Sequence, residues 1–307
     1  MTSPRPPRTP ARPRTCALIP ALALLLPLAA CARGDAGDDG AGDRPRVVSV
    51  SKQINEFMYD IGAQDVIVAK DLTSVYPPQI REKPSVGYHR ALSAEGIIST
   101  RPTLFLTDGN VGPESVLEQL RKVGIPILVL KPGSTVDSAQ LLMARLGREF
   151  HRERVADSVV AAWRQGMERV RADSARRAAG PHPRVLVVHF GQLVNNYLAL
   201  NRGGTADRML AWAGGVNAAD STGGMTRLTP ELFARLAPDV ILATDVGFDR
   251  VGSAEKFAEL PGVALTPAAR TGRIYRIDEA DVMYFGPRTP EAVRRLAALI
   301  HGDSTRT

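Results

Sequence analysis

Two stretches of the chain, "LSAEGIISTRPTLFLTD" (92–108) and "LTPELFARLAPDVILAT" (228–244), decide the fold. They share four residues at identical spacing, namely the pairs Leu92/Leu228, Glu95/Glu231, Pro102/Pro238 and Leu106/Leu242. In each copy Ser93 or Thr229 is suited to cap a short helix, which should end before the proline. The apolar run that follows is typical of a strand covered on both faces in a parallel sheet. The repeat therefore predicts a duplicated α/β unit.

Further strands and helices are expected around each copy. Apolar runs predict strands at 46–50 and 125–130 around the first copy, and at 184–188 and 272–277 around the second. Apolar residues at helical spacing predict helices at about 53–62, 113–123, 205–213 and 289–301. Strands that alternate with helices favour right-handed βαβ units. We therefore expect an α/β protein with two Rossmann-like lobes, each built on a parallel sheet.

Residues 134–179 lie between the two copies and lack proline, and their apolar residues recur at helical spacing. This pattern predicts one helix followed by a longer one that runs from lobe to lobe. About 20 helical residues cover about 30 Å, the size of a lobe. A single long, rigid helix would allow little hinging about a ligand cleft between the lobes. The alternative is a helical subdomain of two ordinary helices.

The expected boundaries follow from these elements. We assign an N-terminal α/β lobe to 46–135, a connecting helical segment to 136–180 and a C-terminal α/β lobe to 181–305. Residues 31–45 are rich in Gly, Ala and Asp and contain no large apolar side chain. Such a segment cannot bury enough surface to fold, so it is predicted to be a flexible tether.

The first 30 residues have the composition of a leader. Residues 1–14 contain four arginines and no acid, and an apolar run then ends at Cys31. That run is too short and too interrupted by proline for a membrane span of about 20 residues. The stretch "LAAC" (28–31) resembles the lipobox of bacterial lipoprotein precursors, which implies a signal peptide over 1–30 and a lipid on Cys31. An ordinary signal peptide is the alternative.

Composition narrows the possible functions. The two cysteines, Cys16 and Cys31, both belong to the leader region, so the mature domain has no thiol for a disulfide, a metal site or a nucleophile. The net charge of +7 falls to +3 without the leader arginines, and no basic run is interleaved with aromatics, so nucleic acid is not an expected partner. No G-x-S-x-G, Walker A, G-x-G-x-x-G or H-E-x-x-H motif is present. An α/β enzyme is therefore the least favoured class.

Several motifs carry a family resemblance. They include "GYHRALSAEGIIS" (87–99), "NRGGTADRMLAWAGGVNAA" (201–219) and "GPRTPEAVRRLA" (286–297), together with the two repeat stretches. Over about 46–302 the chain resembles the haem (hemin) substrate-binding proteins of bacterial ABC importers. These belong to the class III periplasmic binding proteins, which also serve siderophores and cobalamin. The resemblance implies a monomer at the periplasmic or extracytoplasmic face of the cell envelope, with haem as cargo, no catalytic cofactor, and an ABC permease and its ATPase as partners. An iron-siderophore or cobalamin cargo is the alternative.

The resemblance implies that Tyr88 is the axial ligand of the haem iron. A phenolate oxygen is a hard ligand that suits ferric iron, and tyrosine is a known haem ligand. Arg90 could support the phenolate or bind a propionate through paired hydrogen bonds. In an extended loop His89 would face away from both, so a surface imidazole is the favoured interpretation and a role as a ligand is the alternative. Without the resemblance, the favoured interpretation of Tyr88 is a loop tyrosine with its hydroxyl in water.

The second lobe should supply further contacts to the ligand. The candidates are His189, Arg202, Arg227, Arg250, Tyr284 and Arg288. His189 ends a predicted strand, where a parallel sheet delivers residues to a ligand. Arg227 lies in "GGMTRLTPE" (223–231), the duplicate of the Tyr88 loop, where no tyrosine is found. Arg288 could instead simply precede the last helix, with Thr289 as its N-cap.

Glu95 and Glu231 occupy the same position in the two copies. Both fall in the first turn of a predicted helix, where the helix dipole favours an acid. The resemblance implies a further role, in which each glutamate docks into an arginine pocket of one half of the permease. Exposed ion pairs that salt weakens suit a contact that must form and release.

Overall fold

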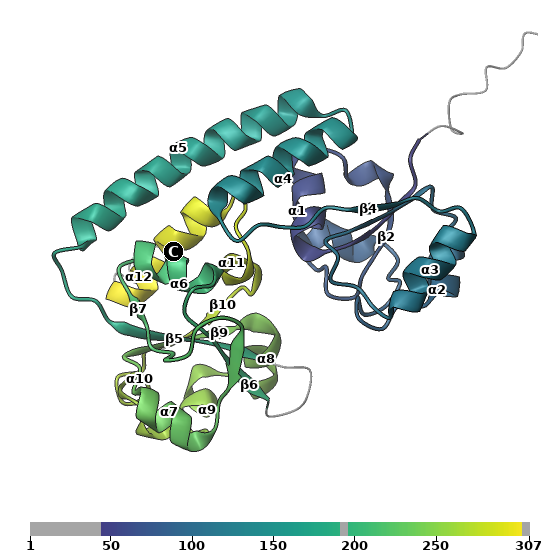
Figure 1. Cartoon of the computed structure of the whole chain (residues 1–307). Coiled ribbons are helices and arrows are strands. Elements are labelled where there is room, and N and C mark those ends of the chain that lie inside the picture. Colours follow the sequence, from purple (N-terminus) through teal and green to yellow (C-terminus); the bar gives the residue numbers. More distant parts are fainter. Residues whose placement is uncertain (1–43, 191–195, 303–307) are drawn as a thin grey trace, which may run out of the picture. The chain divides into compact units, whose positions relative to one another are not determined.

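The computed structural model describes residues 44–190 and 196–302 (Figure 1). The first lobe contains a sheet in the order β2-β1-β3-β4, in which all three pairings are parallel. Its strands are β1 (Val47–Val50), β2 (Ile67–Lys70), β3 (Leu104–Thr107) and β4 (Ile127–Val129). Its helices are α1 (Lys52–Asp60), α2 (Ala94–Ile98) and α3 (Glu114–Lys122), with 3₁₀ turns η1 (Gln64–Val66) and η2 (Pro78–Glu82). The parallel sheet predicted for this lobe is confirmed.

The second lobe contains a sheet in the order β10-β9-β5-β6-β8, with β7 paired to β5. Its strands are β5 (Arg184–Phe190), β6 (Tyr197–Leu200), β7 (Val216–Asn217), β8 (Met225–Arg227), β9 (Val240–Thr244) and β10 (Ile274–Ile277). The expected all-parallel sheet is wrong here, because β6 runs antiparallel to both β5 and β8. Only residues 191–196 separate β5 from β6, too few for the crossover that a parallel pair requires.

Helices cover the second sheet as well (Figure 1). They are α6 (Thr205–Trp212), α7 (Pro230–Leu236), α8 (Asp245–Val251), α9 (Ala254–Ala258), α10 (Pro267–Arg270), α11 (Ala280–Met283) and α12 (Thr289–His301), with the 3₁₀ turn η3 (Val263–Leu265). The last helix, α12, has the bounds predicted from the sequence, 289–301. Within the described residues, no helix is both long and apolar enough to cross a bilayer.

The duplicated stretches begin and end their helices in the same way. The hydroxyls of Ser93 and Thr229 each accept a hydrogen bond from the backbone N–H three residues later, as predicted for N-caps. The residues before the two prolines, Arg101 and Ala237, adopt left-handed φ angles of 51° and 42°. Helical φ and ψ are disfavoured before proline, and both helices end before their proline, α2 at Ile98 and α7 at Leu236.

Two helices connect the lobes, α4 (Val136–Glu149) and the 25-residue α5 (Glu153–Arg177). They pack against each other, and Gly147 of α4 leaves room for Ala156 of α5. Helix α4 also packs on α1 of the first lobe, whereas α5 packs on α6 and α12 of the second (Figure 1). The expected short helix followed by a long one is confirmed.

The connecting helices share one hydrophobic core with both lobes. This core includes Phe57 of α1, Met143 of α4, Trp163 of α5, Met209 of α6 and Leu296 of α12, all nearly inaccessible to solvent. The rings of Phe57 and Trp163 meet edge to face at 6.1 Å. Separate cores cover the opposite faces of the two sheets. Since close-packed interiors resist deformation, the shared core ties the lobes together.

Candidate ligand-binding site

Tyr88 lies in a tight turn just beyond the carboxyl end of β2. The backbone N–H of Leu72, which follows that strand, donates to the carbonyl of Gly87 at 2.8 Å. Gly87 has a φ of +100°, which redirects the chain, and the carbonyl of Tyr88 accepts from the N–H of Ala91 at 2.8 Å. Open α/β sheets bind ligands at the carboxyl ends of their strands, so half-buried Tyr88 occupies a favourable position.

His89 does not face away from Tyr88, and that prediction is wrong. The two ring centroids lie 4.4 Å apart, with the ring planes tilted by 58°. The loop turns at these residues, so the alternation of an extended chain does not apply. His89 is half-buried, with Nδ1 3.9 Å from Oδ2 of the buried Asp71. Burial lowers the pKa of His89, and the nearby charge of Asp71 opposes that effect.

Arg90 is held by a residue that the sequence did not point to. Its Nε and Nη2 donate to Oδ1 of Asn110 at 3.1 and 2.9 Å. Asn110 lies in the loop after β3, so side chains beyond two different strands meet at this edge of the sheet. Its place after the predicted strand at 103–107 was the available signal, because polar residues at the carboxyl end of a parallel strand often face a ligand.

His189 is the penultimate residue of β5 and is half-buried, with Nδ1 3.4 Å from Oγ1 of Thr244. Burial lowers its pKa, the charge of Glu279 raises it, and the charge of Lys52 lowers it. Lys52 also lowers the pKa of His89. One ammonium group therefore acts on an imidazole from each lobe. The Nζ of Lys52 forms an ion pair of 2.5 Å with Glu279. Neither Lys52 nor Glu279 was predicted from the sequence to belong to the site.

An open pocket of about 440 Å³ lies on the second lobe. It is lined by Tyr197, Arg227, Leu228, Thr229, Pro230, Phe233, Leu260 and Pro261. Tyr197 pairs with Phe190 at the end of β5, and Arg227 pairs with Leu198, the neighbour of His189. The pocket therefore borders the same edge of the sheet as His189. Its walls are mostly apolar, with a single guanidinium.

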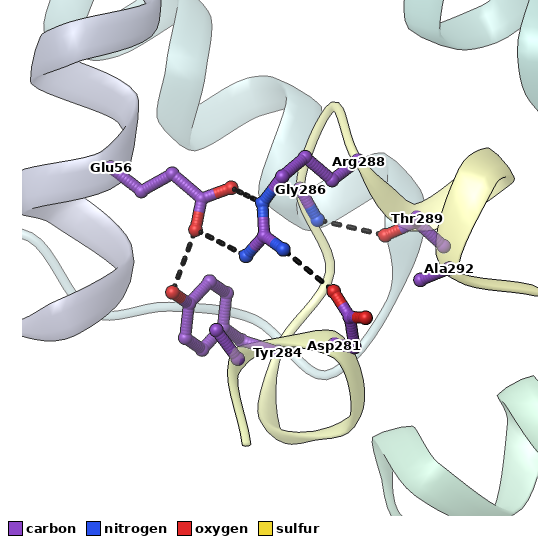
Figure 2. Close-up of a pocket in the computed structure, with 8 residues that line it drawn as sticks. Glu56, Asp281, Tyr284, Gly286, Arg288, Thr289 and Ala292 are labelled. Carbon is purple, nitrogen blue, oxygen red and sulfur yellow. Dashed lines mark hydrogen bonds and ion pairs between the residues drawn. The ribbon is translucent and has the colours of Figure 1, made fainter. Parts of the chain in front are cut away.

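Tyr284 and Arg288 take part in a network that joins the lobes (Figure 2). Arg288 donates to both carboxylate oxygens of Glu56 on α1, at 2.7 and 2.9 Å, and to Oδ1 of Asp281 at 2.6 Å. The hydroxyl of Tyr284 donates to Oε2 of Glu56 at 2.7 Å. We call Glu56, Asp281, Tyr284 and Arg288 the interlobe clasp. The ring of Tyr76 also stacks under the guanidinium at 3.9 Å.

The clasp leaves little room for a ligand. The cavity beside it has a volume of about 10 Å³, enough for about one water molecule. The geometry thus favours a structural role for Tyr284 and Arg288 over the contact with a ligand expected from the sequence. Thr289 as the N-cap is also wrong. Arg288 occupies that position, and the Thr289 hydroxyl accepts from the backbone N–H of Gly286 at 2.9 Å.

The other predicted residues are spread over the surface. Arg202 lies just beyond the end of antiparallel β6, whereas His189 pairs with Leu198 near the start of that strand. The side chain of Arg202 donates to the carbonyl of Asn217. Arg250 is exposed on α8. Glu95 and Glu231 are both exposed in the first turns of α2 and α7. Hydrogen bonds from its own backbone N–H and from a threonine hydroxyl lower the pKa of Glu231.

The predicted lipid-bearing Cys31, the signal peptide and most of the tether lie outside the described residues. Within residues 44–190 and 196–302, no group of three or more His, Cys, Asp or Glu is placed to hold a metal ion.

Comparison with known proteins identifies the family. The family model described as periplasmic binding protein matches residues 47–280, and the chain belongs to this family. The structure of the periplasmic heme-binding protein RhuT from Roseiflexus sp. RS-1 is similar, with a TM-score of 0.76 and 31% identity, over 84% of this chain and 98% of that chain. The predicted two-lobe α/β fold of a class III periplasmic binding protein is thereby confirmed.

Two curated relatives add to this. The chain is 23% identical over 262 residues to the uncharacterized ABC transporter substrate-binding lipoprotein YvrC of Bacillus subtilis (strain 168), covering 84% of this chain and 81% of the relative. It is 36% identical over 95 residues to the vitamin B12-binding protein of Photorhabdus laumondii subsp. laumondii, but that match covers only 31% of this chain and 34% of the relative. The family consists of binding proteins, and the chain is a substrate-binding protein of an ABC importer.

Proposed function

We propose that the chain binds haem between its lobes, with Tyr88 as the axial ligand of ferric iron, and delivers it to an ABC permease. The observation that carries this proposal is the place of Tyr88, in a turn at the carboxyl edge of the first sheet beside Arg90. The chain is similar to a structure named as a heme-binding protein and covers 98% of that structure's chain. This similarity supports the choice of haem as the cargo.

The chemistry of the surrounding residues fits an iron porphyrin. The phenol of Tyr88 can supply a hard anionic oxygen to ferric iron. Leu72, which contacts the same turn through its backbone, exposes 58% of its surface and offers an apolar wall for a porphyrin face. The guanidinium groups of Arg90 and Arg227 can each bind a propionate through charge-assisted hydrogen bonds.

His189 is the candidate for a second contact to the iron. It lies at the carboxyl edge of the second sheet, next to the apolar pocket that contains Arg227. Burial lowers its pKa, so the neutral imidazole dominates at neutral pH. Neutral imidazole is the form that binds a metal.

Hemin titration of the purified protein tests the proposal. We expect a new Soret absorption band on addition of hemin, and its loss or a large shift in Tyr88→Phe, which removes only the hydroxyl. Tyr275→Phe on β10 is the matched control and should bind hemin like the wild type. Equal hemin spectra for the wild type and Tyr88→Phe would refute the role of Tyr88.

Cobalamin is the second candidate cargo, favoured by the partial similarity to a vitamin B12-binding protein. The same titration with cyanocobalamin separates the two. Binding of cyanocobalamin or an iron-siderophore, without any response to hemin, would replace haem as the cargo.

The proposal includes the place of work. We propose that Cys31 carries a lipid that anchors the protein at the extracytoplasmic face of the membrane, and that the protein works there as a monomer. The lipoprotein name of the Bacillus subtilis relative supports the anchor. Incorporation of labelled palmitate into the wild type, but not into Cys31→Ser, would test it.

A further inference from the structure

We propose that Asn110 is a positioning residue that orients Arg90 and His89 around Tyr88. The inference rests on the proposed function, because it assigns Asn110 to the haem site. Asn110 lies after β3 and the Tyr88 turn lies after β2, so its side chain links two separate loops.

The bond to Arg90 restricts an exposed side chain. A free arginine at the surface samples many rotamers, at an entropy of about 2 kcal/mol. Here Nε and Nη2 both donate to the single oxygen Oδ1 of Asn110. Within the described part of the chain, Nη1 of Arg90 has no hydrogen-bond partner. One edge of the guanidinium is therefore fixed, and the other is left for a ligand carboxylate.

The same amide contacts His89. The Nδ2 of Asn110 lies 3.5 Å from Nε2 of His89. On the other side of the imidazole, Nδ1 of His89 faces Asp71. Asp71 is itself held, since Oδ2 accepts from the N–H of Thr73 at 2.9 Å and Oδ1 accepts from the hydroxyl of Ser74 at 2.5 Å. The imidazole is thus placed between a fixed carboxylate and Asn110, and it packs against the ring of Tyr88.

The two contacts need opposite ends of the amide. Arg90 can only donate, so it requires the oxygen, and the NH₂ group is then directed to His89. The backbone of Asn110 is fixed as well, because its N–H donates to Oδ1 of Asp108 at 2.8 Å. The loops are also joined by the N–H of Gly112, which donates to the carbonyl of His89 at 2.9 Å. One side chain thereby sets the direction of the guanidinium of Arg90 and of the imidazole of His89.

The test measures hemin release from the full-length protein to apomyoglobin. We expect Asn110→Ala to release hemin about tenfold faster, which corresponds to about 1.4 kcal/mol. Asn110→Asp keeps an acceptor for Arg90 and should release hemin more slowly than Asn110→Ala. The control Gln119→Ala, which removes an exposed amide from α3, should match the wild type.

A double-mutant cycle separates positioning from general loop stability. If Asn110 acts through Arg90, the variant Asn110→Ala/Arg90→Ala should release hemin at the rate of Arg90→Ala alone. Additive effects both in this cycle and in the corresponding cycle with His89→Ala would overturn the inference, as would a release rate of Asn110→Ala within twofold of the wild type. In either case a lost Soret band in Tyr88→Phe would leave the proposed function intact. A normal band in Tyr88→Phe would refute the proposed function itself.

Discussion

Glu56 and Arg288 form a two-point ion pair between α1 of the first lobe and the N-cap of α12, with N–O distances of 2.7 and 2.9 Å (Figure 2). Glu56 exposes only 2% of its side chain, and Tyr284 donates a third hydrogen bond to it. The pair therefore joins the lobes at a point where little water competes. Together with the shared core, it links the two lobes directly.

Breaking the pair should destabilise the protein. Arg288→Ala leaves the buried carboxylate of Glu56 without its cation, and such losses cost about 3–5 kcal/mol. We expect the free energy of unfolding, measured by urea denaturation, to fall by about 3 kcal/mol. Arg276→Ala, which removes an exposed ion pair with Asp249, should cost at most about 1 kcal/mol. Equal losses in the two variants would contradict the structural role of the clasp.

The stability of the protein should depend on pH through Asp60, one helical turn after Glu56. Burial and the charge of Glu56 raise the pKa of Asp60 to about 7, although Arg288 lowers it. In the unfolded chain this pKa is about 3.9. Between these values the folded state binds more protons than the unfolded state, so stability falls as the pH rises from about 4 to about 7.

Asp60→Asn tests this dependence. The variant cannot ionise, so we expect it to be more stable than the wild type by about 1–2 kcal/mol at pH 8, a discounted value for a partly buried group. At pH 4 the difference should nearly vanish. Asp65→Asn, at an exposed carboxylate nearby, should show no such trend. A stability difference that is the same at pH 4 and pH 8 would count against the raised pKa.

Arg227 should contribute to affinity through the ligand's carboxylates. We expect Arg227→Ala to weaken hemin binding about tenfold, the loss of one charge-assisted hydrogen bond. Hemin dimethyl ester, in which both propionates are blocked, should bind the wild type and the variant equally. Arg202→Ala, at an arginine far from the pocket, serves as the control. A similar loss with the ester would show that Arg227 acts in another way.

Glu95 and Glu231 should matter for transport and leave hemin binding unchanged. Reversing both charges, in Glu95→Lys/Glu231→Lys, should slow hemin uptake by vesicles that contain the permease, because complementary exposed charges guide docking. Glu114→Lys, at another exposed first-turn glutamate, is the matched control. Uptake as fast as that of this control would argue against docking through the glutamate pair.

Ligand binding should change the spacing of the lobes very little. The helices α4 and α5 share one core with both lobes, and the clasp adds a buried ion pair. We expect the radius of gyration in X-ray scattering to change by less than about 1 Å when hemin is added, as in other pre-organised complexes. A larger contraction would mean that the lobes hinge despite the shared core.

Sequence patterns predicted the local elements well, because those depend on neighbouring residues. The caps at Ser93 and Thr229, the stops before Pro102 and Pro238, and the final helix at 289–301 all follow from short-range rules. The antiparallel strand β6 was missed, since its direction depends on a connection too short to cross over. The turn at His89 was missed as well, because its geometry comes from contacts with the loop after β3.

The sequence by itself determined a duplicated α/β chain with a helical connector, and it pointed to Tyr88, Glu95 and Glu231 through repeated or family-like motifs. Only the tertiary structure showed that Arg288 pairs with Glu56 and that Asn110 holds Arg90. Those partners are 232 and 20 residues apart in the chain. No periodicity or capping rule reaches over such separations, so a polar residue's partner is known only once packing has brought the distant segments together.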